Sequence, residues 1–135
     1  MDWGRALAPT LDDITDIAEE AFEKLPATFR KLVEDVTIRV QDFPEDEVIA
    51  SLEAETEFDL LGLFTGVAVA GRMGADLPPG LLPNMVFLYR RPILDFWAEN
   101  EETLEAVVTH VLVHEIGHHF GLSDEDMERI EASVS

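Results

Sequence analysis

The segment 101–119, EETLEAVVTHVLVHEIGHH, constrains the fold more than any other part of the chain. Its apolar residues recur at spacings of three and four, which predicts an α-helix, and further apolar residues widen this face. We therefore expect the helix to be largely buried. Asn100 is its expected N-cap, and Gly121 is expected to end it because glycine tolerates positive φ. Ser123 or Asp124 then begins a last short helix.

The composition excludes several classes of partner. The chain has 29 acidic and 9 basic residues, a formal net charge of −20, and no cysteine. Such a charge repels nucleic acid and anionic lipid, and the absence of cysteine excludes disulfides and thiolate metal sites. No window approaches the ~18 apolar residues needed to cross a bilayer, and the N-terminus lacks the features of a signal peptide. We expect one cytoplasmic domain over residues 1–135 that binds neither nucleic acid nor membrane.

Helix signals dominate the N-terminal part of the chain. Thr10 and Asp13 match a capping box for a helix that ends at Pro26. Pro26 and Pro44 each suit the first turn of a further short helix. Between these prolines, the alternating segment 37–40 predicts a strand.

Strands are also expected in the middle of the chain. The segment 58–72 combines strand-forming residues with glycines, and 85–91 is a strand-forming run closed by Pro92. The prolines of 76–83 predict a loop between them. The whole pattern predicts an α+β fold with a small, few-stranded sheet, a buried C-terminal helix and N-terminal helices.

His114, Glu115 and His118 form an H-E-x-x-H motif inside the buried helix. Residues four apart on a helix project side by side, so both imidazoles can bind one Zn²⁺ at ~2.0–2.1 Å. Glu115 points beside the metal, where it can accept a proton from a metal-bound water whose pKa is lowered to ~7. Three ionisable side chains on a buried helix are costly unless a metal compensates them. The motif therefore predicts a single zinc ion, with Glu115 as the catalytic base.

Asp124 is the expected third ligand. The motif continues as His118-x-x-Gly121-x-x-Asp124, a layout typical of metzincin sites, which usually have a third histidine at the last position. A carboxylate is a competent zinc ligand, and three protein ligands leave a fourth position open for water. Asp124 could instead be only a helix cap, which would leave Glu125 or Glu128 as the third ligand.

The motif HEIGHHFGLSD at 114–124, the preceding strand VFLYRRPI and the small acidic domain resemble the minimal zincin-like metallopeptidases of bacteria. The resemblance implies a compact zincin core in which a few-stranded sheet packs on the active-site helix. It also implies that His114, His118 and Asp124 are the zinc ligands and that Glu115 is the general base. The expected activity is a zinc-dependent metallopeptidase that hydrolyses a peptide or protein substrate.

Two other functions use a similar set of ligands. A zinc-stabilised protein-binding module with weak or no catalysis would have the same metal site, and the small size of the chain favours it modestly. A metal-dependent endoribonuclease has three histidines at a similar spacing. Asp124 and the net charge of −20 oppose that second alternative, because RNA binding depends on basic surfaces.

The sequence does not assign a role to the other two histidines, His110 and His119. His110 lies one turn before His114, and we expect it to be a polar neighbour at the solvent edge of the helix. The alternatives are that it contacts a metal ligand or donates to the transition state. His119 is expected to face away from the metal.

Tyr89, Arg90 and Arg91 are placed on the predicted strand 85–91. If the edge of this strand binds an extended substrate, Tyr89 or an arginine would lie near the scissile carbonyl. The alternative is that the two arginines pair with surface carboxylates.

Overall fold

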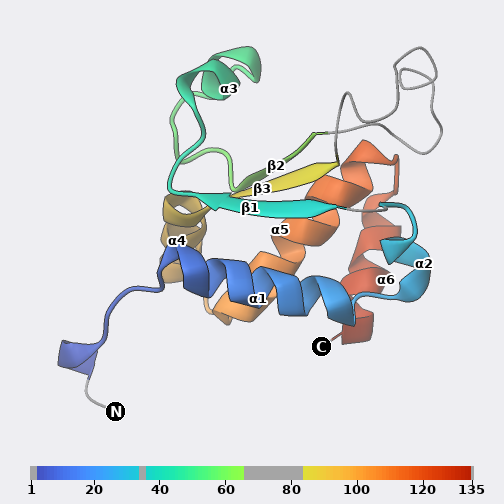
Figure 1. Ribbon diagram of the computed structural model, residues 1–135, viewed down its shortest axis with the longest axis horizontal. Helices are drawn as coiled ribbons and strands as arrows, with labels where there is room; N and C mark the ends of the chain where they lie inside the picture. Colours follow the sequence, from blue (N-terminus) through green and yellow to red (C-terminus); the bar gives the residue numbers. More distant parts are fainter. Residues whose placement is uncertain (1–2, 34–35, 66–83, 135) are drawn as a thin grey trace.

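The computed structural model describes residues 3–33, 36–65 and 84–134 (Figure 1). In these ranges the fold is α+β, as expected, with a small three-stranded sheet. The predicted strand within 58–72 is present as a strand only at 62–65; residues 66–72 and the predicted loop 76–83 lie outside the described residues. The elements follow in the order η1 (Trp3–Arg5), α1 (Leu11–Lys24), α2 (Ala27–Arg30), β1 (Thr37–Gln41), α3 (Asp46–Ser51), β2 (Gly62–Thr65), β3 (Met85–Tyr89), α4 (Arg90–Glu99), α5 (Leu104–His119) and α6 (Asp124–Val134).

The sheet has the strand order β1-β3-β2. β1 runs parallel to β3, with Ile38 opposite Val86, and β2 runs antiparallel to β3, with Phe64 opposite the same Val86. β3 is therefore paired on both sides. The prediction that this strand offers a free edge to substrate is wrong. In the described part of the chain β2 is an edge strand, and it packs against α5.

The core forms around α5, which contacts α1, β2, β3, α4 and α6. Figure 1 shows α1 and α5 on the same side of the sheet. Val108, Leu112 and Ile116 on α5 are fully buried in one cluster with residues of α1 and β3. The predicted burial of this helix is confirmed. Among the described residues, no helix combines the length and the apolarity needed to cross a membrane.

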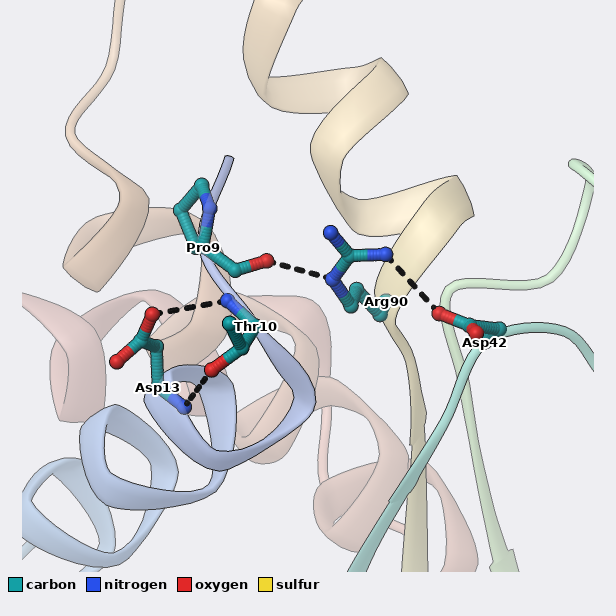
Figure 2. Close-up of polar contacts among 5 residues, drawn as sticks. All are labelled: Pro9, Thr10, Asp13, Asp42 and Arg90. Carbon is teal, nitrogen blue, oxygen red and sulfur yellow. Dashed lines mark hydrogen bonds and ion pairs between the residues drawn. The ribbon is translucent and has the colours of Figure 1, made fainter. Parts of the chain in front are cut away.

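Local hydrogen bonds explain where α1 begins (Figure 2). The hydroxyl of Thr10 accepts a hydrogen bond from the Asp13 backbone N–H at 3.1 Å, and the Asp13 carboxylate accepts one from the Thr10 N–H at 2.9 Å. The predicted capping box is thus confirmed. It satisfies two donors that a helix N-terminus would otherwise leave free.

The strand predicted at 85–91 ends at Tyr89, and α4 begins at Arg90. The prediction that Arg90 and Arg91 extend the strand is therefore wrong. Pro92 was interpreted as the end of a strand, but it is the third residue of α4. A proline is tolerated in the first turn of a helix because its missing N–H would have no partner there.

Arg90 joins three segments that are distant in the sequence (Figure 2). Its Nε donates to the Pro9 carbonyl just before α1, and its Nη1 lies 3.1 Å from the Asp42 carboxylate just after β1. Arg91 packs differently, with its guanidinium carbon 5.9 Å from the ring centroid of Phe43. For Arg90, the predicted pairing with a surface carboxylate is confirmed.

The start of α5 also differs from the prediction. Asn100 ends α4 as its C-cap, and its side-chain amide donates to the Phe96 carbonyl at 2.7 Å. Thr103 is the N-cap of α5, because its hydroxyl accepts from the Ala106 N–H at 3.1 Å. The predicted N-cap is therefore wrong, because the additional helix α4 ends at Asn100 and α5 begins after Thr103.

The turn between α5 and α6 has the expected form. Gly121 has a φ of +77°, and hydrogen bonds from Gly121 N–H to the His118 carbonyl and from Leu122 N–H to the Gly117 carbonyl close it. This pattern is a Schellman motif. The hydroxyl of Ser123 then accepts from the Asp126 N–H at 3.1 Å, so Ser123 caps α6.

We expect Thr10→Ala to lower the free energy of unfolding by about 1 kcal/mol, because it removes the cap of α1. Urea unfolding followed by circular dichroism measures this change. Thr15→Ala is the matched control, since Thr15 lies inside α1 and its hydroxyl only donates to the Leu11 carbonyl. That control should leave stability unchanged or slightly higher. An equal loss in both variants would contradict the assigned role of the cap.

Candidate active site

Three histidines form one stripe along α5. His110, His114 and His118 are spaced four apart and therefore lie on the same side of the helix. The ring centroids of His110 and His114 are 3.9 Å apart, and those of His114 and His118 are 5.5 Å apart. Their side chains are 50%, 22% and 60% exposed in that order. The stripe is thus open to solvent on a helix that is otherwise buried.

His118 and Asp124 face each other across the turn. His118 Nε2 lies 3.9 Å from Asp124 Oδ1. Asp124 is the first residue of α6, and because Ser123 provides the cap, the carboxylate of Asp124 is not used for capping. Glu125 and Glu128, the alternatives considered as third ligand, are exposed on the same helix.

Glu131 was not predicted, and it contacts two of the histidines. Its Oε1 lies 2.9 Å from His110 Nδ1, and its Oε2 lies 3.1 Å from His114 Nε2. Among the described residues, these are the three whose ligand atoms all lie within 4.8 Å of one another. The structure therefore brings His114 to Glu131, while His118 and Asp124 form a separate pair. The sequence carried one signal for this cluster, the spacing of four between His110 and His114.

Glu115 lies on the side of α5 that faces β2. A Cβ atom added to Gly62 would lie 3.2 Å from Glu115 Cγ and 2.7 Å from Val111 Cγ1. The absence of a side chain at Gly62 thus lets the strand approach the helix beside the glutamate. Burial raises the pKa of Glu115 to about 7 from its ordinary value of 4.5, because burial penalises the charged form.

A cleft of about 260 Å³ opens beside this glutamate. His114 and Glu115 line it from α5 and Phe96 from α4, and the opposite wall is the segment 59–62 that leads into β2. His110 also lines the cleft. A histidine of the HExxH motif and its glutamate thus share one concave surface, where a substrate could be held beside both side chains.

Tyr89 lies on the inner side of this region rather than in the cleft. It is 1% exposed. Burial, with a smaller contribution from the negative charge of Glu115, raises the pKa of Tyr89 to about 12. The phenol therefore stays neutral at any ordinary pH.

His119 packs away from the stripe, as expected. Its ring centroid lies 4.3 Å from that of Phe64 on β2. Its Nε2 is buried without a hydrogen-bond partner among the described residues, and burial lowers the pKa of the imidazole. His119 is therefore held neutral, as part of the packing between α5 and the sheet.

The donor groups fit a zinc ion in kind. Two imidazoles and one carboxylate form a common zinc ligand set. A tetrahedral ion with bonds of ~2.0–2.1 Å requires ligand atoms about 3.3 Å apart. The contacts of Glu131 with the two histidines, at 2.9 and 3.1 Å, are close to this spacing, and the 3.9 Å between His118 and Asp124 requires a small approach.

The chain belongs to the zincin-like metallopeptidase family. The family model of that description matches residues 33–134, a range that includes the sheet, α4 and the whole histidine stripe. A comparison with curated proteins finds no match. The predicted family is therefore confirmed, and the family carries zinc binding and peptide hydrolysis as its general character.

We expect the stability of the metal-free protein to depend on the charge of Glu115. Because its pKa is raised to about 7, the folded state binds more protons than the unfolded state between pH 4.5 and 7, and stability falls as pH rises through this window. Glu115→Gln removes the effect. It should stabilise the protein at pH 8 by up to about 3 kcal/mol and change little at pH 4.5.

Urea unfolding with EDTA at both pH values measures this difference. Glu99→Gln, an exposed position at the end of α4, is the matched control and should show no such pH dependence. A Glu115→Gln effect of equal size at both pH values would contradict the raised pKa.

Proposed function

We propose that the chain is a single-domain zinc-dependent metallopeptidase in which His114, His118 and Asp124 hold one Zn²⁺ and Glu115 is the general base. The observation that carries the proposal is the position of Glu115, which is half-buried in the wall of a cleft next to His114 and has a pKa of about 7. Membership of the zincin-like metallopeptidase family supports an amide bond as the one cleaved.

In the proposed mechanism the zinc ion and Glu115 have different chemical roles. When bound, Zn²⁺ supplies Lewis-acid polarisation of the substrate carbonyl and makes water a stronger acid. Glu115 takes a proton from the attacking water and transfers it to the leaving nitrogen. A carboxylate with a pKa near the working pH suits both transfers, because it accepts and releases a proton at comparable cost.

β2 is the element best placed to bind an extended peptide. In the part of the chain that the structure describes it is a sheet edge, and its first residue, Gly62, lines the cleft. A peptide added to this edge as a further strand would pass Glu115 and His114. The net charge of −20 favours peptides without long acidic runs.

The test is zinc content measured beside peptide cleavage. We expect Glu115→Gln to keep about one zinc per chain while cleavage of a peptide library falls by about 10²- to 10⁴-fold, the usual contribution of a general base. His114→Asn should lose both. Glu99→Gln, an exposed position at the end of α4 that does not line the cleft, should keep both.

Two outcomes would contradict the proposal. A Glu115→Gln variant with wild-type cleavage would exclude this residue as the base. A wild type that binds one zinc but cleaves nothing in the library would favour a zinc-stabilised binding module instead.

A further inference from the structure

Two overlapping pairs of histidines lie on α5. His110 and His114 are four residues apart, and so are His114 and His118, so each pair has the spacing that lets two imidazoles share one metal ion. The neighbouring helix α6 offers one carboxylate to each pair, from Glu131 and Asp124 respectively. The same ligand chemistry is thus present twice, with His114 common to both sets.

The set formed by His110, His114 and Glu131 is the more compact of the two. Glu131 uses one carboxylate oxygen for each histidine, at 2.9 and 3.1 Å, and all three ligand atoms lie within 4.8 Å of one another. The Glu131 side chain is only 24% exposed, so its carboxylate is held at this place rather than free in solvent. A zinc ion bound here would need ligand atoms about 3.3 Å apart, which is close to the present distances between Glu131 and the two histidines.

We infer that His110, His114 and Glu131 form a second zinc-binding set that excludes the first. The reason is that both sets use His114, whose Nε2 lies 3.1 Å from Glu131, and one imidazole nitrogen has one lone pair to give to a metal. The chain therefore binds a single ion, which occupies either set. This inference rests on the proposed function, because His114 is also a ligand of the proposed catalytic zinc.

The position of the ion decides whether Glu115 can act. A helix rises about 1.5 Å per residue, so the two sets are centred about 6 Å apart along α5. The first set spans the residues on both sides of Glu115, while the second lies on its N-terminal side. A general base must lie about 2.6–3.2 Å from the proton it takes. Zinc held by Glu131 is therefore centred farther from Glu115 along α5 than zinc in the first set, and we expect it to be less active.

The experiment removes the first set and asks whether zinc remains. His118→Asn with Asp124→Asn changes only two side chains that are mostly exposed, so the fold should persist. We expect this double variant to bind about one zinc per chain, measured by mass spectrometry after dialysis and by competition with a chromophoric chelator. Adding Glu131→Gln should lower zinc affinity by about 100-fold or more, because loss of a direct ligand should cost at least as much as loss of a group that only holds a ligand in place, about 10- to 100-fold. Adding Glu99→Gln instead should change nothing.

Each other outcome has a definite meaning. A double variant that binds no zinc, while circular dichroism shows it folded, would overturn the inference and leave the proposed catalytic set intact. If Glu131→Gln alone loses zinc while the double variant keeps it, the inference is supported. The same result would overturn His118 and Asp124 as the proposed ligands. Two zinc ions per wild-type chain would overturn mutual exclusion. A wild type that binds no zinc would overturn both proposals.

Discussion

The burial of α5 is the constraint on which the rest of the structure depends. The helix is apolar on most of its circumference, and α1, α4, α6 and the sheet cover it on nearly every side. Packing this dense leaves one strip of the helix for polar side chains. The histidines occupy that strip, and Glu115 lies at its border with the core. The histidines of the candidate site are therefore held on a helix that packs against several neighbours, which limits how far they can move.

Burying a polar side chain next to the core costs free energy, and the three side chains concerned lie in one region of the fold. Glu115, Tyr89 and His119 all lie where α5 meets the strands, and burial shifts the pKa of each toward its neutral form. Of the three, only Glu115 lines the cleft, and its pKa is raised to about 7. Tyr89 and His119 stay neutral and serve packing. One interface thus makes a single group ready for proton transfer.

Local signals in the sequence predicted most of the helices, and non-local contacts explain what they missed. The capping box at Thr10 and the glycine at 121 depend on residues within a few positions, so they were correctly read. Pro92 is ambiguous in the sequence because a proline can end a strand or lie in the first turn of a helix. Here α4 begins at Arg90, whose contacts with Pro9 and Asp42 form only in the folded chain. The HExxH motif is also local, whereas Glu131 is seventeen residues from His114 with no motif to connect them.

The turn at Gly121 connects these local and distant features. Its positive φ reverses the chain, and the Ser123 cap fixes where α6 begins, so Asp124 meets His118 at the start of the helix pair. α6 then runs back along α5, and two turns later Glu131 reaches His114 and His110. The turn at Gly121 and the packing of α6 on α5 thus position the carboxylates of both Asp124 and Glu131. The turn that places Asp124 beside His118 therefore also brings Glu131, about two helical turns further along the same side of α6, to His114. The proposed competition for that imidazole follows from the geometry of this turn.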